Sequence, residues 1–481
     1  MKRFYRLLLV VGSWAGAASA WAQGQSPTSF SLEQCIDYAL KNSFNVQNAV
    51  IDQQIAAAKV KETVGLGLPQ VSGSASIQHN EQLRRFFGRY STTPGSFSFF
   101  PITPGANDGD ILAAQNFFQL KSSGDAGLNV NQLIFSGSYF VGLQASRTFK
   151  DLSVKQANQT KEQVIELVTK AYYNVLINEE RETLFNNNIS RLDSLLKSTK
   201  ALNKNGFAED IDVDRIQVAY NNIQSERNKF VNLKKLGLEL LKFQMGYPIS
   251  AELSVVGKIE DVQVTSDLSS YLDKWDYKTR PDYQVLETNQ KLQKLNIKNQ
   301  YAGALPTISA FANLGYSTQS NSIGGLFTTN TNISDNGSIG PDKWYGYSLF
   351  GVTLNMNIFT GFQRQYKIQQ EKLTLQKVEN GFRTLKESIN LETKQASINF
   401  ENAITSLTSQ KENMELANKV ARVTKIKYEQ GVGSNIEVVD AENSLRTAQT
   451  NYYNALFDAM IAKVDIDKAY GKILTNQNTQ K

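Results

Sequence analysis

The residue types that most often perform catalysis or bind metals are scarce in this sequence. The chain of 481 residues contains one cysteine, Cys35, and one histidine, His79. A single cysteine excludes a disulfide within the chain and a thiolate cage for a metal ion, and a single histidine disfavours Ser–His or Cys–His catalysis. Paired carboxylates remain compatible with the sequence, but no nucleophile beside a base stands out. The sequence therefore predicts that the protein is not an enzyme and binds no cofactor or metal.

Charge argues against nucleic acid as a partner. The formal net charge is +6, but Lys2, Arg3 and Arg6 lie in residues 1–22, which have the basic start, apolar run and small residues of a cleaved signal peptide. Without these three, 48 basic residues face 45 acidic ones, a net charge of +3 that is too dispersed for a nucleic-acid surface. Beyond residue 22 no stretch is apolar enough for a transmembrane helix.

Two long stretches have the composition and periodicity of uninterrupted helices. Glycine is absent from 143–205 and from 382–430, and both stretches lack proline. Apolar side chains recur mostly three or four positions apart, for example from Val378 to Leu407. The 63 residues of the first stretch would form a helix of roughly 95 Å at about 1.5 Å per residue. A helix of that length must pack along neighbouring helices, because one compact domain cannot cover it.

A similar turn follows each long stretch. Gly206 in Asn-Gly-Phe and Gly431 in Gln-Gly-Val suit the left-handed backbone that ends a helix. Asp210, and either Ser434 or Asn435, are suited to cap the next helix. The sequence thus predicts two helical hairpins, although a single hairpin of this kind is common in helical bundles.

The segments before the long stretches also repeat. Leu-Ile-Phe-Ser-Gly around Phe135 corresponds to Asn-Ile-Phe-Thr-Gly around Phe359, and Leu-Pro-Gln-Val-Ser at Pro69 corresponds to Leu-Pro-Thr-Ile-Ser at Pro306. Together with the turns, these landmarks occur in the same order twice, which predicts an internal duplication. The predicted parts are a signal peptide at 1–22, a first repeat at 23–246, a connector at 247–283, a second repeat at 284–471 and a tail at 472–481.

Four short segments alternate apolar and polar residues, as β-strands do. They run from Val71 to Ile77, from Ala126 to Val130, from Ile308 to Tyr316 and from Phe350 to Met356. Their polar positions are mainly Ser, Asn, Gln and Thr, which favours lipid on one face and water on the other over a soluble sandwich. The residues Trp344, Tyr345 and Tyr347 are suited to an aromatic girdle at a membrane interface.

The connections between the strands are long. The loops 83–122 and 318–343 are rich in Gly, Ser, Asn and Pro, and we expect them outside the cell. Their phenylalanines either fold over the mouth or pack the first loop against itself; these are Phe86, Phe87, Phe97, Phe99 and Phe100. Four strands do not close a membrane barrel, since the smallest use about eight. Because open strand edges are not tolerated in lipid, the chain is expected to share its barrel with copies of itself.

The ordered set of these features resembles the outer membrane efflux family typified by TolC. The matching residues are Ser31-Leu32-Glu33-Gln34 at the start of a helix, Leu-Pro-x-(Val/Ile)-Ser before a strand, Ile-Phe-(Ser/Thr)-Gly after a strand, and the glycine turns with acidic residues. The resemblance implies an α+β membrane protein that assembles as a homotrimer. Very long coiled-coil-like helices would form a periplasmic α-barrel, and four strands per chain would contribute to a shared twelve-stranded β-barrel in outer-membrane lipid.

The resemblance also implies a function. The chain would be the passive exit duct of a tripartite efflux or type I secretion system in a Gram-negative bacterium, docked on a periplasmic adaptor protein and an inner-membrane pump of the RND, ABC or MFS class. The connector would belong to a belt around the tunnel. A periplasmic adaptor is the alternative, because adaptors also carry long hairpins, but they normally have one hairpin rather than two that each follow a strand pair.

By the same resemblance, the turns form a gate at the periplasmic tip. Asp212, Glu437 and Asp440 match carboxylates of the tip, and Tyr428 matches a tyrosine of a closing latch. In a trimer these carboxylates would attract cations, although acidic residues also favour the first turn of any helix without facing a pore. Gly433 stands where an arginine completes the latch in relatives, so a salt-bridged lock is not implied here. The residues assigned to the turns and to adaptor docking are Gly206, Phe207, Asp210, Gly431, Val432 and Gly433.

Overall fold

The computed structural model describes residues 29–93, 100, 103–116, 118–257, 259, 271, 275–328 and 344–474. The expected signal peptide, Phe97, Phe99 and most of the second long loop lie outside these ranges. The chain divides into two compact units. The first consists of residues 1–52, 154–285 and 382–481, and the second consists of residues 53–153 and 286–381.

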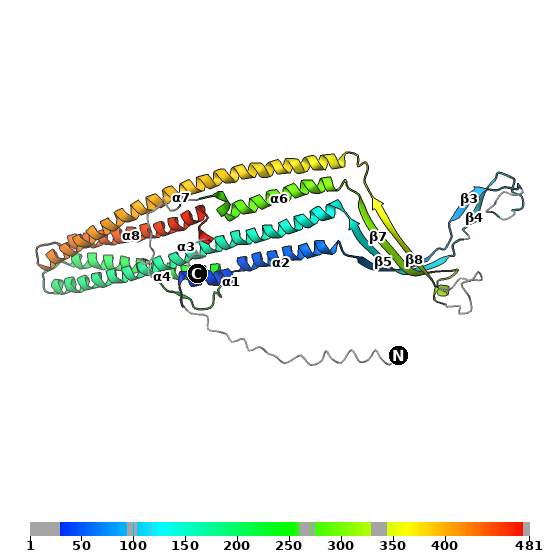
Figure 1. Ribbon diagram of the computed structural model, residues 1–481. Coiled ribbons are helices and arrows are strands. Elements are labelled where there is room, and N and C mark those ends of the chain that lie inside the picture. The colour runs from blue at the N-terminus through cyan, green and yellow to red at the C-terminus, as the bar shows by residue number, and fades with distance from the viewer. Residues whose placement is uncertain are drawn as a thin grey trace, which may run out of the picture. The chain divides into compact units, whose positions relative to one another are not determined.

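Two helices of nearly equal length dominate the chain, as predicted. Helix α3 (Gly137–Lys204) has 68 residues and α7 (Gln363–Glu429) has 67. Each ends in a tight turn and is followed by a shorter helix, α4 (Asp210–Met245) or α8 (Asn435–Ala469), to form a hairpin (Figure 1). The absence of glycine and proline from most of α3 and α7 lets the backbone hydrogen bonds continue without a break.

The first described residues, from Ser29 onward, pack into the first unit. Helix α1 (Leu32–Asn42) begins with a capping box, in which the Ser31 hydroxyl accepts from the Gln34 N–H and the Gln34 side chain accepts from the Ser31 N–H. Strand β1 (Ser29–Phe30) pairs in parallel with β6 (Ser254–Val255). The Cys35 side chain is fully buried among apolar residues of α1, α3 and α4, and this burial raises the pKa of the thiol to about 12. Cys35 is therefore an inert core residue.

The second unit is built on one antiparallel sheet in the order β2-β5-β7-β8. Its strands confirm the four predicted ones: β2 (Gln70–His79), β5 (Ser122–Phe135), β7 (Thr307–Ser320) and β8 (Tyr345–Asn355). Strands β5 and β7 pair over almost their whole lengths, with a register shift between Leu133 and Phe135, so the strand pairs of the two chain halves form a single sheet (Figure 1). Helices α2 (Phe44–Gly65) and α6 (Pro281–Ala302) precede β2 and β7.

The register gives the sheet one apolar face and one polar face. Val71, Val130, Ala312 and Phe350 form one row of directly paired residues, and Ser72, Asn129 and Asn313 belong to the next row. Because side chains alternate along a strand, these rows point to opposite faces. The apolar face is uncovered in the single chain, where Phe350 is 69% exposed and Val352 is 67% exposed. Among the described residues, no helix combines the length and hydropathy that a membrane span requires.

For the phenylalanines of the first long loop, the alternative that the loop packs against itself is supported, whereas the expected girdle needs correction. The first long loop contains its own hairpin, in which β3 (Arg85–Arg89) pairs with β4 (Ile111–Gln115), and the Phe86 and Phe100 rings lie 6.2 Å apart within the loop. The girdle prediction is wrong for Tyr345 and Tyr347. Tyr347 is paired with Gly315, an odd-numbered position like Asn313, and therefore lies on the polar face.

Candidate functional site

Both turns have the same backbone geometry. The φ angles of Gly206 and Gly431 are 80° and 77°, in the left-handed region that favours glycine. The N–H of Phe207 donates to the Leu202 carbonyl at 2.9 Å, and the N–H of Val432 donates to the Lys427 carbonyl at 3.0 Å. Each glycine N–H donates to the carbonyl three residues earlier. These are Schellman motifs, which satisfy the last carbonyls of α3 and α7.

The residue after each glycine is large, apolar and exposed. Phe207 is 81% exposed and Val432 is 77% exposed. In a Schellman motif this residue often packs back onto the preceding helix. Two such side chains directed into solvent leave matching apolar contacts available to a partner.

The helices that follow the turns start differently. The Ser434 hydroxyl accepts from the Glu437 N–H at 3.3 Å and caps α8, as predicted. The cap expected at Asp210 is wrong, because Glu209 holds the cap position of α4 and makes no side-chain bond there. The Asp210 carboxylate instead accepts from the Asn203 side chain at 2.8 Å. It is one residue too far along the chain to reach the backbone donors that a cap satisfies.

The structure brings the two hairpins together just behind the turns. The buried Asn435 side chain donates to the Asp212 carbonyl at 3.2 Å, across 223 positions of sequence. Val438 is buried in a cluster with Ile216 of α4 and Leu196 of α3. The half-buried Tyr428 packs against the same cluster, and its hydroxyl lies 3.4 Å from the Thr199 hydroxyl.

The backbone approaches Gly433 closely. A Cβ atom added at Gly433 would lie 3.0 Å from the Tyr428 backbone nitrogen and 3.2 Å from the Lys427 carbonyl carbon. Since these are backbone atoms, they cannot move aside as a flexible side chain would. In this conformation any side chain at position 433 would require the backbone of the last turn of α7 to shift by a few tenths of an ångström.

The predicted gate carboxylates occupy different surroundings. Asp212 is half-buried and forms an ion pair of 3.6 Å with Arg215. Glu437 is exposed and has no ion pair within the described part of the chain. Asp440 is exposed and borders a groove of about 460 Å³ between α4 and α8, together with Asp214 and Arg215. The described residues contain no group of three potential ligands that would hold a metal ion.

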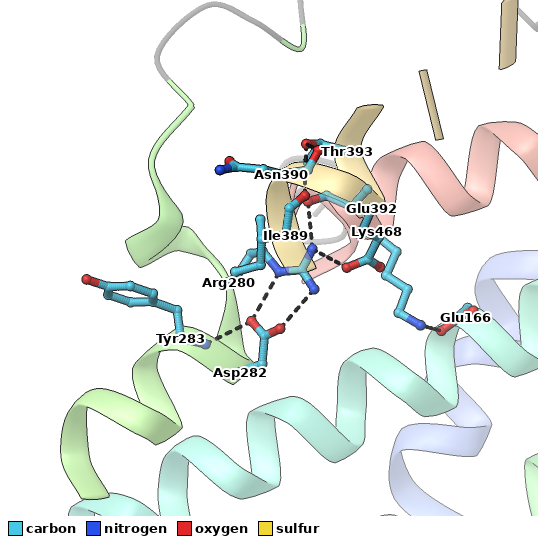
Figure 2. A network of polar contacts seen from close by, with 10 residues as sticks. Glu166, Arg280, Asp282, Tyr283, Ile389, Asn390, Glu392, Thr393 and Lys468 are labelled. Atoms are coloured by element: carbon cyan, nitrogen blue, oxygen red, sulfur yellow. Dashed lines mark hydrogen bonds and ion pairs between the residues drawn. The ribbon is translucent and has the colours of Figure 1, made fainter. Parts of the chain in front are cut away.

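Sequence reasoning missed a polar network in the first unit (Figure 2). The Arg280 guanidinium bonds both carboxylate oxygens of Asp282, the Glu392 carboxylate at 2.8 Å and the Ala469 carbonyl at 2.9 Å. Nearby, the Glu166 carboxylate accepts from Lys170 and Lys468. The network joins residues from α3, α6, α7 and α8, which are far apart in sequence. No short sequence motif therefore predicts it.

Two carboxyl groups of this network have pKa values shifted in opposite directions. Burial raises the pKa of Glu162 to about 7, although Arg280 opposes the shift. Glu166 is also buried, but hydrogen bonds from Lys170 and Lys468 outweigh its desolvation and lower its pKa. These residues hold the segment before α6 against α7 and the end of α8.

The fold is that of solved outer membrane channels. The Campylobacter jejuni CmeC outer membrane channel superposes with a TM-score of 0.68 at 17% identity, covering 93% of this chain and 89% of that one. The open state of the Neisseria gonorrhoeae MtrE outer membrane channel superposes with a TM-score of 0.67 at 18% identity, covering 92% of this chain and 89% of that one.

The sequence comparisons agree with the fold. The probable efflux pump outer membrane protein TtgC of Pseudomonas putida is 24% identical over 333 residues, which are 68% of this chain and 64% of that protein. The outer membrane protein TolC of Vibrio cholerae is 20% identical over 348 residues, covering 72% of this chain and 76% of that protein. The chain thus matches less than two thirds of the length of TtgC. Residues 277–472 match the family described as "Outer membrane efflux protein", and this match confirms the resemblance for that part of the chain.

Proposed function

We propose that the chain is one subunit of a channel in the outer membrane of a Gram-negative bacterium. The channel acts as the passive exit duct of a tripartite efflux or type I secretion system and catalyses no reaction. The observation that carries this proposal is the two-faced sheet, whose exposed apolar face suits lipid and whose polar face suits water. The naming of TtgC as a probable efflux pump protein favours efflux.

The edges of the sheet support a trimer. Strands β2 and β8 are its two outer strands, and each lacks a neighbour in the sheet on one side. In lipid these edges require partners, which neighbouring subunits supply when β8 of one chain pairs with β2 of the next. Three chains would close a twelve-stranded barrel, and their helical hairpins would form the periplasmic α-barrel. The nearly equal lengths of α3 and α7 and the matching hydrogen bonds of the two turns also favour an internal duplication.

The turns are proposed as the gate and the docking site. Phe207 and Val432 would contact a periplasmic adaptor, which links the duct to an inner-membrane pump. Glu437 and Asp440 would line the entrance, and the contact between Tyr428 and Thr199 would open when the hairpins separate. The connector before α6 would stay fixed by the Arg280 network during that movement.

Fractionation and electron microscopy test the proposed class. We expect the protein in outer membranes, extracted only by detergent, as hollow particles with threefold symmetry that form ion channels in planar bilayers. A water-soluble monomer in the periplasm would contradict this proposal and favour the adaptor alternative.

A further inference from the structure

In one row of directly paired residues of the sheet, the residues on β5 and β7 are both glycines and therefore have no side chain. Gly127 of β5 pairs with Gly315 of β7, which pairs with Tyr347 of β8. A Cβ atom added at Gly315 would lie 2.8 Å from the Tyr347 hydroxyl oxygen, and one added at Gly127 would lie 3.1 Å from it. The two glycines therefore leave a slot in which the Tyr347 side chain lies across β7 and reaches β5.

At the end of this slot, Tyr347 holds a carboxylate. The Tyr347 hydroxyl donates to Asp125 Oδ2 at 3.0 Å. Asp125 lies two residues before Gly127 and therefore on the same polar face. Its directly paired residues on the neighbouring strands are Ser76 of β2 and Ser317 of β7. Within the described part of the chain, no cation pairs with Asp125.

Asp125 is unusual among the residues of the sheet. The sequences of β2, β5, β7 and β8 contain no other Asp, Glu, Lys or Arg. A carboxylate that served only to stabilise the sheet would be expected to have a counter-ion, since an unpaired charge loses solvation without gaining an ion pair. The side chain lies on the polar face, where the Tyr347 hydroxyl positions it.

We infer that Asp125 is a cation-selectivity determinant of the passage and that Tyr347 is its positioning residue. This inference rests on the proposed trimeric channel. Cyclic symmetry would place three Asp125 carboxylates at one level of the passage, and the lipid-covered wall would focus their field. Rings of carboxylates attract cations and repel anions. The site would favour the passage of small cations and cationic solutes at the sheet end, far along the chain from the carboxylates of the turns.

Ion selectivity in planar bilayers tests the inference. The protein is reconstituted as purified channels, and the reversal potential is measured in a KCl gradient. We expect Asp125→Asn, which removes the charge but keeps an acceptor for Tyr347, to lower the cation-to-anion permeability ratio by about twofold or more. We expect Tyr347→Phe, which removes only the hydroxyl, to cause a smaller decrease in the same direction.

A rescue variant separates electrostatics from structure. In Asp125→Asn/Asn129→Asp the carboxylate returns on the same face, and we expect the permeability ratio to recover. The variants are also compared in a Glu437→Gln/Asp440→Asn background, so that the carboxylates of the turns do not mask the effect. An unchanged reversal potential for Asp125→Asn in both backgrounds overturns the inference while the channel function stands. If the unaltered protein forms no channels, the proposed function fails together with the inference.

Discussion

At the level of single residues, helices α4 and α8 begin at equivalent positions after the two turns, but their N-terminal cap residues differ. Ser434 accepts a backbone hydrogen bond at the start of α8, whereas Glu209 makes no such bond at the start of α4. We expect Ser434→Ala to destabilise the start of α8 by about 1 kcal/mol. Glu209→Ala is the matched control and should have a much smaller effect. Hydrogen exchange of the first turn of each helix measures both, and equal acceleration in the two variants would contradict the assignment of the caps.

The gate proposal also concerns single residues. Glu437→Gln/Asp440→Asn removes two exposed negative charges near the turn, and we expect weaker block by La³⁺ added to the compartment that faces the turns. The control is Glu412→Gln/Glu415→Gln, which removes an exposed pair of the same spacing from α7. If both double variants behave like the unaltered channel, Glu437 and Asp440 do not line the entrance.

At the level of elements, Glu162 and Glu166 lie on neighbouring turns of α3 beside the Arg280 network. Their shifted pKa values make the free energy of unfolding depend on pH. Folding raises the pKa of Glu162 to about 7, so the folded state binds the proton more tightly than the unfolded chain, whose carboxyl titrates near 4.3. Stability should therefore fall as pH rises from about 4.3 to 7 and then level off. At about 1.4 kcal/mol per pKa unit, this difference corresponds to roughly 3–4 kcal/mol. We expect Glu162→Gln to remove this loss and to raise the thermal midpoint at pH 8.

Glu166 supplies a control of opposite sign. Its pKa is lowered by Lys170 and Lys468, so its contribution is present at neutral pH and is lost as pH falls through its folded pKa. Glu166→Gln should lower the thermal midpoint at pH 8, because Lys468 loses its ion pair and Lys170 retains only Asp465. If both variants shift the midpoint in the same direction at pH 8, the assigned protonation states are wrong.

The elements were predictable where a pattern is local and not where it depends on distant segments. The long helices follow from the absence of glycine and proline, and the strands follow from strict alternation. The alternation also determines the face of the sheet on which Tyr347 lies. The aromatic side chain nevertheless favoured a girdle at the membrane interface, whereas the pairing with Gly315 places it on the polar face. The Arg280 network and the contact between Asn435 and Asp212 join residues far apart in sequence, and no periodicity encodes such contacts.

At the level of the whole molecule, the open edges of the sheet predict which residues meet between subunits. Ser74 of β2 and Leu349 and Thr353 of β8 lie on the polar face. We combine Ser74→Cys with either Leu349→Cys or Thr353→Cys. At least one of these two combinations should form an inter-chain disulfide and thereby a covalent trimer. Ser348 lies on the opposite face, and a cysteine there should not cross-link with Ser74→Cys. Denaturing electrophoresis without reductant measures the products. The buried Cys35 does not interfere, because burial raises the pKa of its thiol to about 12.

Without inter-chain products from any polar-face pair, the edge pairing proposed for the trimer would fail. Products from Ser348 and Leu349 alike would instead indicate collisions of a mobile edge.

The pairing of β5 with β7 has a consequence for biogenesis. The two strands are separated by more than 170 residues, so the centre of the sheet cannot form until the second half of the polypeptide has been synthesised and exported. Until then the early hairpin of β2 and β5 carries an unpaired edge and an uncovered apolar surface, which makes it prone to aggregation. If the chain is the proposed channel subunit, we expect this hairpin to need cover by a partner, such as a holding chaperone, until β7 has been exported.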